Sequence, residues 1–394
     1  MNLQTVEEAV NKCTLFFKKL NLEISISEFD EDFVQIDFPR EYEEIIYTSE
    51  DFLEYVDGIE DINFSLENVY IKNISQHPIF ATDQLESLLD KIRFHFENEE
   101  FTLEVVKFPF LLGIANVKYS YYSKYAPSCT TYYALEIKYK GNQKLSLEEE
   151  KKIIKTFIFE YYQATNILLE TTELFDFDTE FYGFEEEEEE NDDKLKDICI
   201  NELIEYNDSI ESYLKAADTK DSEIKFLCYY KIIEFFSPKV AKLKAYEIMS
   251  RKLETIKYRN VENDDLNKLF EISDSYKKSK SDSELCKTVL SISVDIIDIF
   301  NLLPVSIIKF ICKNTKLNPK DINYELNQEN IDSIFQQLGR ILYSTRNKIV
   351  HAKSNYVSDG FECKNEDLNE LNEFLSKATF QILIWNNKLP KHSK

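Results

Sequence analysis

Glycine is scarce in this sequence, which has six glycines and eight prolines in 394 residues. A phosphate-binding loop, a dinucleotide-binding turn and the nucleophile elbow of many hydrolases each need closely spaced glycines, and none of these patterns is present. No two histidines stand at metal-ligand spacing either. The sequence therefore carries no motif for three classes of protein: nucleotide hydrolases with a phosphate-binding loop, serine hydrolases, and enzymes that bind a metal through paired histidines.

Paired cysteines and long apolar runs are missing too. The seven cysteines lie singly, so we predict no zinc knuckle, no redox motif, no metal and no other cofactor. No apolar run approaches the roughly 18 residues of a membrane span, and the nearest, at 108–117, suits a buried strand. The N-terminus has acidic residues before its apolar ones, unlike a secretion signal. We expect a protein of the reducing cytoplasm that does not act at a membrane.

Positive charge is in short supply, because the formal net charge is −26. This argues against a general nucleic-acid scaffold, since phosphate binding depends on Lys and Arg replacing condensed counterions. The deficit is concentrated: residues 171–193 hold twelve acidic side chains and no basic one. We predict a solvated acidic linker over 171–195, although such a segment could also imitate nucleic acid and shield a basic surface.

Aromatic residues, by contrast, are abundant, with 29 phenylalanines and 24 tyrosines. This composition predicts well-packed cores, and the length predicts two domains. Residues 1–170 mix alternating segments with helical ones and predict an α+β domain. Strands are expected at 22–29, 33–38, 68–74, 101–108 and 131–140, and helices at 50–59, 82–96 and from Ser146 onward.

Residues 196–394 show helical periodicity throughout and predict an all-α domain. Pro238, Pro304 and Pro319 fall between the apolar periodic segments, where proline would end helices without damaging their interiors. Helices are expected at 197–217, 222–236, 240–259, 285–303 and 331–353.

The last of these predicted helices has two distinct faces at 100° per residue. One is an apolar stripe that should pack into the core, formed by Phe335, Leu338, Leu342, Thr345 and Ile349. The opposite face is polar and carries Arg340, Ser344, Asn347 and His351, with Arg346 at the boundary near the core stripe. A histidine on such a face is most often an ordinary surface residue.

Arg346, Asn347 and His351 nevertheless spell Arg-Asn-x-x-x-His, late in a helical domain and after an aromatic-rich helix. In this, residues 197–390 resemble the HEPN superfamily, and among its members the helical domains named for the ApeA defence proteins. The resemblance implies a four-to-five-helix bundle that acts as a metal-independent endoribonuclease, in abortive-infection defence against phage. One departure is that Lys353 stands where HEPN toxins paired with nucleotidyltransferase antitoxins have a tyrosine, and Tyr356 comes later.

The three motif residues suit cleavage of RNA by its own 2'-hydroxyl. A neutral imidazole can act as base or acid near neutral pH, so we assign that role to His351. Arg346 would hold the scissile phosphate, and Asn347, one turn before the histidine, would orient the imidazole or bind the phosphate. One histidine cannot easily perform both proton transfers, which predicts a homodimer with two copies of the motif in one composite site.

Supporting residues are expected on the helix before the motif. Glu234 would pair with Arg346 across the bundle, or else be a solvated carboxylate at a helix end. Tyr229 and Tyr230 would stack on bases, although such a pair more often lies in a core.

A basic segment at 237–259 offers a path for the RNA backbone, with seven basic residues against two acidic ones. Its candidate contacts are Lys239, Lys242, Lys244, Arg251 and Lys252, extended by Lys277, Lys278 and Lys280, and a solvated face is the plainer reading. The first domain would sense a phage-derived trigger.

Two other functions remain open at this point. The helical domain could be a non-catalytic HEPN module that binds RNA, a nucleotide or a protein. Alternatively, the chain could be an interaction protein whose acidic surface engages a basic partner, in which case Arg346 and His351 are ordinary surface groups.

Overall fold

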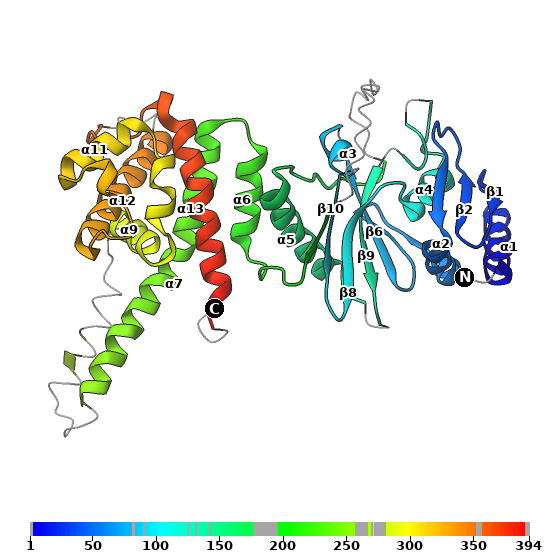
Figure 1. The fold of residues 1–394 in the computed structure, drawn as a ribbon, viewed down its shortest axis with the longest axis horizontal. Coiled ribbons are helices and arrows are strands. Elements are labelled where there is room, and N and C mark those ends of the chain that lie inside the picture. Colours follow the sequence, from blue (N-terminus) through cyan, green and yellow to red (C-terminus); the bar gives the residue numbers. More distant parts are fainter. Residues whose placement is uncertain are drawn as a thin grey trace. The chain divides into compact units, whose positions relative to one another are not determined.

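We describe a computed structural model of the chain, shown in Figure 1. Its contacts divide it into two compact units, Met1–Leu203 and Ile204–Lys394. The first unit is α+β with two sheets and the second is helical, which confirms the predicted fold class. The residues described are 3–80, 83–89, 91–124, 126–130, 132–141, 144–175, 196–256, 267, 268, 271, 281–351 and 357–390.

The first unit contains a three-stranded and a seven-stranded sheet. The small sheet has the order β1-β2-β3, with β1 (Ser25–Phe29), β2 (Phe33–Asp37) and β3 (Ile45–Thr48), all antiparallel. The large sheet has the order β10-β7-β8-β9-β6-β5-β4, formed by β4 (Asn63–Phe64), β5 (Val69–Tyr70), β6 (Ile74–Phe80), β7 (Ile92–Glu97), β8 (Phe101–Val106), β9 (Tyr132–Tyr139) and β10 (Lys196–Ile200). Its strands pair antiparallel except β10, which runs parallel to β7.

Among its described residues, five α-helices accompany these sheets: α1 (Leu3–Lys19), α2 (Ser49–Asp57), α3 (Asp83–Leu89), α4 (Phe110–Lys118) and α5 (Leu147–Thr165), with a 3-10 turn, η1 (Ile59–Asp61). The predicted helix start at Ser146 is confirmed, because the Ser146 hydroxyl and Glu149 form a reciprocal capping box. On α5, Phe157 and Tyr161 pack edge-on against Phe94 of β7. This helix therefore covers the face of the sheet to which Phe94 points.

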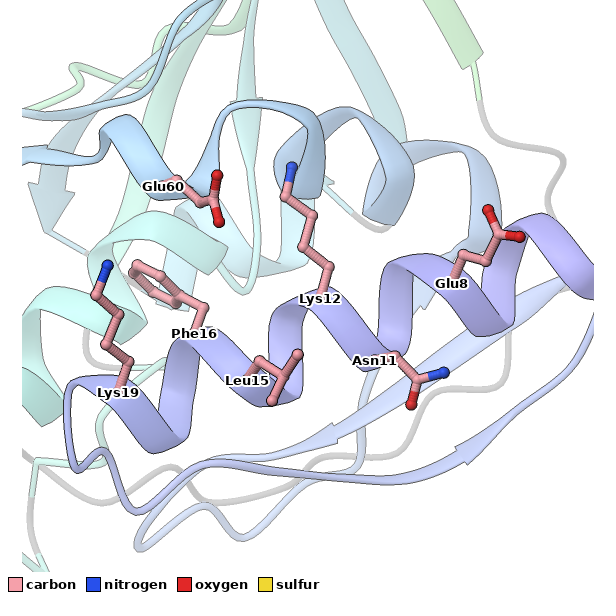
Figure 2. A pocket seen from close by; sticks show the side chains of 7 residues that line it. All are labelled: Glu8, Asn11, Lys12, Leu15, Phe16, Lys19 and Glu60. Atoms are coloured by element: carbon pink, nitrogen blue, oxygen red, sulfur yellow. The ribbon is translucent and has the colours of Figure 1, made fainter.

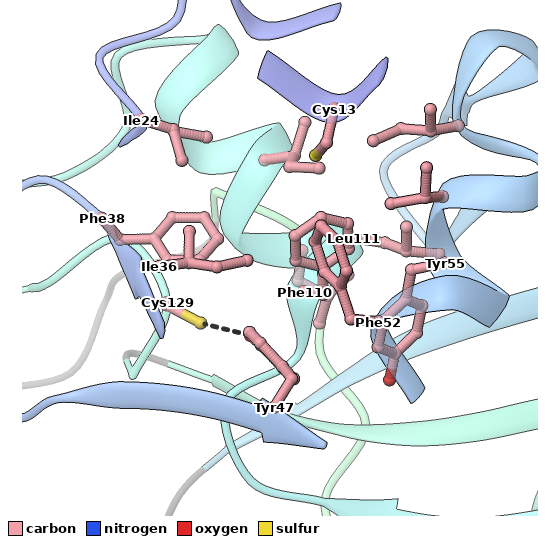
Figure 3. Packing of buried hydrophobic residues seen from close by; sticks show 14 of the residues in the cluster. Cys13, Ile24, Ile36, Phe38, Tyr47, Phe52, Tyr55, Phe110, Leu111 and Cys129 are labelled. Atoms are coloured by element: carbon pink, nitrogen blue, oxygen red, sulfur yellow. Dashed lines mark hydrogen bonds between the residues drawn. The ribbon is translucent and has the colours of Figure 1, made fainter. Parts of the chain in front are cut away.

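The apolar run at 108–117 is not the expected strand. It forms α4, and every side chain from Phe110 to Val117 is buried. A helix that is covered on all sides is apolar all round, so its sequence lacks the polar positions that would reveal a helical period. Figure 3 shows Phe110 at the centre of this core, stacked on Tyr55 and edge-on to Phe38, Tyr47 and Phe52.

Two predicted helices also proved to be partly strands. Only Asp83–Leu89 of the segment 82–96 is helical, and β7 follows, because residues 92–97 alternate buried and more exposed side chains. Likewise β10 occupies the start of the segment 197–217, and helix begins only at Asp208. Residues 196–203 therefore belong to the first unit and not to the helical domain.

The described residues of the second unit form helices (Figure 1). They are α6 (Asp208–Asp218), α7 (Ser222–Ile256), α9 (Asp282–Ser293), α10 (Ile296–Ile299), α11 (Val305–Thr315), α12 (Gln328–His351) and α13 (Leu368–Lys388), with 3-10 turns η2 (Phe300–Leu302), η3 (Pro319–Asp321) and η4 (Asn365–Asp367). Among the described residues, no helix is long and apolar enough to cross a membrane.

Two predicted helix boundaries in this unit are wrong. Pro238 lies inside α7 and does not end it. The proline removes the N–H that would bond the carbonyl of Glu234, but Ile233, Phe236 and Val240 are buried around it, so tertiary packing maintains the helix. The segment 285–303 is divided, because Asp295 caps a new helix by accepting a hydrogen bond from the backbone N–H of Ile297.

Close packing of α9 on α12 depends on Gly339. A methyl group there would lie 2.8 Å from the carbonyl oxygen of Ser283 and 3.1 Å from the Lys287 backbone nitrogen. We expect Gly339→Ala to destabilise the helical unit by about 1–3 kcal/mol. The free energy of unfolding can be measured in urea by the fluorescence of Trp385, the single tryptophan, which lies in α13 of the same unit. Gly141→Ala, where the added methyl meets nothing within 4 Å, should change stability by less than about 0.5 kcal/mol.

Candidate functional site

Helix α12 presents its apolar stripe to the bundle, as the sequence predicts. Phe335, Leu338, Leu342 and Thr345 are buried, and Ile349 is half-buried near the end of the helix. The polar face is less uniform than expected, because Ser344 is also buried, with 3% of its surface exposed. Its placement with the solvent-facing residues is therefore wrong.

Ser344 is buried because the chain after α12 returns along this face. The Ser344 hydroxyl donates to Asp359 Oδ2 at 2.8 Å, and the backbone N–H of Cys363 donates to Thr345 Oγ1 at 2.8 Å. The guanidinium of Arg340 lies 3.8 Å from the ring centroid of Phe361. Arg340 and Ser344 thus hold this returning segment, and neither belongs to the motif.

Arg346 and Asn347 lie next to each other in space as well as in sequence. The Arg346 guanidinium donates from Nη1 to Asn347 Oδ1 at 3.2 Å. Its Nε lies 3.9 Å from Glu234 Oε1 of α7, so the pairing expected across the bundle is present. About a third of the Arg346 side chain is exposed, at 32%, which leaves the charged group accessible. The partly exposed guanidinium therefore donates one hydrogen bond to Asn347, and Glu234 lies within ion-pair distance of it.

Glu234 is also close to the buried side of the bundle. Burial, together with the negative charge of Glu234, raises the pKa of the Cys286 thiol to about 12. Burial raises the pKa of Tyr230, and the charges of Cys286 and Glu234 raise it further while Arg346 lowers it. The ion pair therefore joins α7 and α12 at the boundary between core and solvent.

His351 is the last described residue of α12 and is exposed. It lies five positions after Arg346, which corresponds to a rotation of about 140° around the helix. Asn347 and His351, four positions apart, share a face, whereas Arg346 points toward α7. The side chains of Arg346 and His351 therefore diverge within one chain.

The tyrosines expected to stack on bases are in the core. Tyr229 and Tyr230 are each 2% exposed, and they pack against Tyr213 and Phe226 respectively. The core interpretation is the correct one for both residues.

Other aromatic residues of α7 are exposed, and the sequence analysis missed them. Phe235 and Tyr246 are 47% and 53% exposed, whereas Phe226 and Phe236 of the same helix are buried. They lie within about 60° of Lys239 and Lys242 on the helical wheel, and Lys242 Nζ lies 5.4 Å from the ring centroid of Tyr246. We call Phe235, Lys239, Lys242 and Tyr246 the α7 face. The recurrence of an aromatic eleven residues after the first is the signal that could have revealed it.

The other basic residues of α7 do not share this face. Lys244 and Arg251 are rotated by about 160–180° from Lys242, and Arg251 is paired with Glu247. Lys252 is half-buried, and Lys239, which belongs to the α7 face, donates a hydrogen bond to Asn386 of α13. The basic residues thus surround the helix and do not form one stripe. Lys277, Lys278, Lys280, Lys353, Tyr356 and residues 176–195 of the predicted linker lie outside the described residues.

A shallow groove in the first unit lies between α1 and η1, as Figure 2 shows. It is lined by Glu8, Asn11, Lys12, Leu15, Phe16, Lys19 and Glu60. Lys12 Nζ donates to the carbonyl oxygens of Val56 and Asp57, at the C-terminal end of α2, at 2.9 and 3.4 Å. This lysine therefore caps a helix, and the groove contains no group poised for chemistry.

Comparisons with known proteins give no family for the chain. No family model matches the sequence, and no match was found among the curated proteins or the solved structures.

Proposed function

We propose that the helical unit is a metal-independent endoribonuclease of the HEPN type. The observation that carries this proposal is the accessible guanidinium of Arg346, held by Glu234 and Asn347 on the helix that ends at His351. A guanidinium fixed by two partners is preorganised to bind a phosphate and to stabilise added negative charge on it.

The reaction uses the nucleophile that RNA supplies. One His351 imidazole removes the proton of the 2'-hydroxyl, and the oxygen attacks the adjacent phosphorus. The phosphorus–O5' bond breaks, and a protonated imidazole donates a proton to the leaving oxygen. The products are a 2',3'-cyclic phosphate and a 5'-hydroxyl, and Arg346 stabilises the charge that develops on the phosphate between them. No step calls for a metal ion.

The geometry of α12 supports a homodimeric site. Arg346 and His351 diverge by about 140° on one helix, and one histidine cannot easily perform both proton transfers. A second chain would bring its own Arg346 and His351 to the same phosphate. The proposed active form therefore contains two copies of each residue.

The α7 face is the path we propose for the RNA strand. Single-stranded nucleic acid binds where aromatic rings stack on bases between cations that follow the backbone. Phe235 and Tyr246 supply the rings, and Lys239 and Lys242 supply the cations. In α7 this face adjoins Glu234, which contacts Arg346.

We further propose that the protein acts in the cytoplasm as an abortive-infection effector, with the first unit sensing a phage-derived trigger. This role rests on the resemblance of residues 197–390 to the ApeA-type helical domains.

A second candidate is a non-catalytic module that binds RNA, a nucleotide or a protein. The contact between Arg346 and Glu234 is the observation that favours this candidate. An ion pair that joins two helices can serve the stability of the bundle alone, without a role in catalysis. The chain would then bind RNA through the α7 face without cutting it.

Incubation of the purified chain with single-stranded RNA and EDTA distinguishes the two candidates. The nuclease is expected to leave 2',3'-cyclic phosphate ends and to elute as a dimer in size-exclusion chromatography. Binding without cleavage, abolished in a Phe235→Ala, Tyr246→Ala variant, would favour the binding module. Cleavage by a stable monomer would contradict the composite site.

A further inference from the structure

Strands β7 and β10 bring together side chains that are about a hundred positions apart in the sequence. The two strands are parallel neighbours, and their register pairs His95 with Cys199 and Arg93 with Asp197. Side chains two residues apart on a strand point to the same face, so His95 and Glu97 share a face of the sheet, as do Asp197 and Cys199. The short distances among His95, Glu97 and Cys199, and between His95 and Asp197, place all four side chains on one face.

This cluster has the composition of a transition-metal site. A ring nitrogen of His95, a carboxylate oxygen of Glu97 and Sγ of Cys199 all lie within 4.8 Å of one another. Ligands of a tetrahedral Zn²⁺ at 2.0–2.3 Å from the metal are separated by about 3.5 Å, so side-chain shifts of roughly 1 Å close the site. Imidazole, thiolate and carboxylate are each ordinary zinc ligands.

The imidazole of His95 lacks a hydrogen bond that it would normally make. Its Nδ1 is buried and accepts or donates no hydrogen bond among the described residues, although Asp197 Oδ1 lies 3.1 Å away. An imidazole shielded from water, with 12% of its side chain exposed, is thus left partly unsatisfied beside a thiol and two carboxylates.

The neighbouring charges leave the cluster attractive to a cation. Arg93, which lies beside Asp197 in the register, is bound to Glu104 of β8 at 2.8 Å. Lys140 lies 2.6 Å from Glu97 Oε1, so the other oxygen of that carboxylate is the one that would face a metal. Arg93 and Lys140 are each paired with a carboxylate, so their positive charges are offset. Glu97, Asp197 and the Cys199 thiol, which loses its proton on metal binding, therefore leave the cluster with a net negative charge.

We propose that His95, Glu97 and Cys199 bind one Zn²⁺ ion, with Asp197 orienting the imidazole and water in the fourth position. The metal ties β10, an edge strand that makes only five residue pairs with β7, to the rest of the sheet. β10 ends at Ile200, just before the helical unit begins at Ile204. Metal binding would therefore hold β10, the last strand of the first unit, against β7 close to the start of the helical unit.

The test is Zn²⁺ binding by the full chain, read out by alkylation of Cys199. All seven cysteines are among the described residues, and only Cys199 is exposed, so iodoacetamide should modify it first in the native protein. Stoichiometric Zn²⁺ is expected to protect Cys199 from alkylation, and Co²⁺ to give the visible absorption of a tetrahedral, thiolate-bound ion. Isothermal titration should show one site per chain.

Variants separate this site from weak binding to other acidic residues. We expect Cys199→Ser and His95→Gln to lose the tight site, and Asp197→Asn to weaken it by about 10- to 100-fold. Cys228→Ser, which removes a half-buried cysteine of α7, is the matched control and should bind as the wild type does. A large excess of Mg²⁺ should not compete, because a thiolate and an imidazole do not select it.

Three results would overturn the proposal. One is alkylation of Cys199 at the same rate with and without Zn²⁺. Another is unchanged Zn²⁺ affinity in Cys199→Ser and His95→Gln, and the last is displacement of Zn²⁺ by Mg²⁺, which would assign the binding to acidic side chains elsewhere. None of these outcomes bears on RNA cleavage, because the cluster belongs to the first unit.

Discussion

An Arg346→Ala variant is expected to cleave RNA about 10²- to 10³-fold more slowly than the wild type, with most of the loss in kcat. The guanidinium is held by Glu234 and Asn347, so it stabilises charge on the phosphate without reorganising during the reaction. Arg346→Lys should recover only part of the rate, because an ammonium lacks the planar fork that engages two phosphate oxygens. Single-turnover cleavage of a labelled RNA measures the effect.

Arg340→Ala is the matched control for this experiment. It removes the same side chain six positions earlier on α12, but Arg340 packs over Phe361 and does not contact Glu234. We expect its cleavage rate to stay within a few-fold of the wild type at equal folding. An equal loss in both variants would mean that general positive charge, and not the fixed guanidinium, supports cleavage.

Glu150→Gln is expected to destabilise the first unit by roughly 3 kcal/mol, the largest stability effect we predict for an isosteric change. Glu150 is fully buried, and its Oε2 lies 2.9 Å from His77 Nε2 and 3.1 Å from the Ser75 hydroxyl. Its Oε1 accepts a hydrogen bond from the Tyr139 hydroxyl at 2.7 Å. Neutralising the carboxylate leaves this buried network without the charge around which its donors are arranged.

The effect of pH on this variant follows from the sign of the pKa shift. Burial raises the pKa of Glu150, but the hydrogen bond and charge of His77, the Tyr139 hydroxyl and Lys144 lower it by more, so the net shift is downward. A carboxyl group with a lowered pKa stabilises the folded state above its unfolded pKa of about 4.3, and this contribution disappears as the pH falls through the lowered value. The difference between wild type and Glu150→Gln should therefore be full at neutral pH and shrink in acid.

Glu136→Gln provides the control, because this carboxylate of β9 is also buried, whereas its partners differ from those of Glu150, which lies on α5. Its Oε2 accepts from both Tyr55 and Gln76, at 2.7 and 2.5 Å, and a glutamine oxygen can do the same. Burial raises the pKa of Glu136, so a neutral side chain removes a desolvation cost. We expect a change below about 1 kcal/mol in urea unfolding followed by circular dichroism, with hydrogen exchange in β6 and β9 locating it. Equal destabilisation by both variants would contradict this assignment of the two carboxylates.

Much of the fold could be predicted because most of its helices and strands bury one face and expose the other, which gives the sequence a regular period. The strands expected at 33–38, 101–108 and 131–140 and the helix from Ser146 carry a clear period, and they form close to where expected. The single strand expected at 68–74 is wrong, because Val69–Tyr70 forms β5 and a separate strand, β6, begins at Ile74. The segment 108–117 could not be assigned in this way, since α4 is covered on all sides and shows no period. Strand β10 is short and its partner β7 lies a hundred positions away, so only the tertiary pairing identifies it.

The candidate site shows the same division between local and distant information. The sequence places Asn347 and His351 on one face of a helix, and it suggested Glu234 as a partner of Arg346, which the structure shows. It could not show that Ser344 is covered, because the covering segment at 357–363 returns from beyond the helix. The ligand cluster around His95 and Cys199 was missed for the same reason: its members meet only through strand pairing.

The most direct test of the central claim compares the purified wild-type chain with His351→Ala on single-stranded RNA in EDTA, after circular dichroism has shown equal folding. We predict that the wild type leaves 2',3'-cyclic phosphate ends and that the variant loses about 10²- to 10⁴-fold in rate, the usual contribution of a general acid–base group. Equal cleavage by the two proteins would contradict the account, because it would remove His351 from the mechanism.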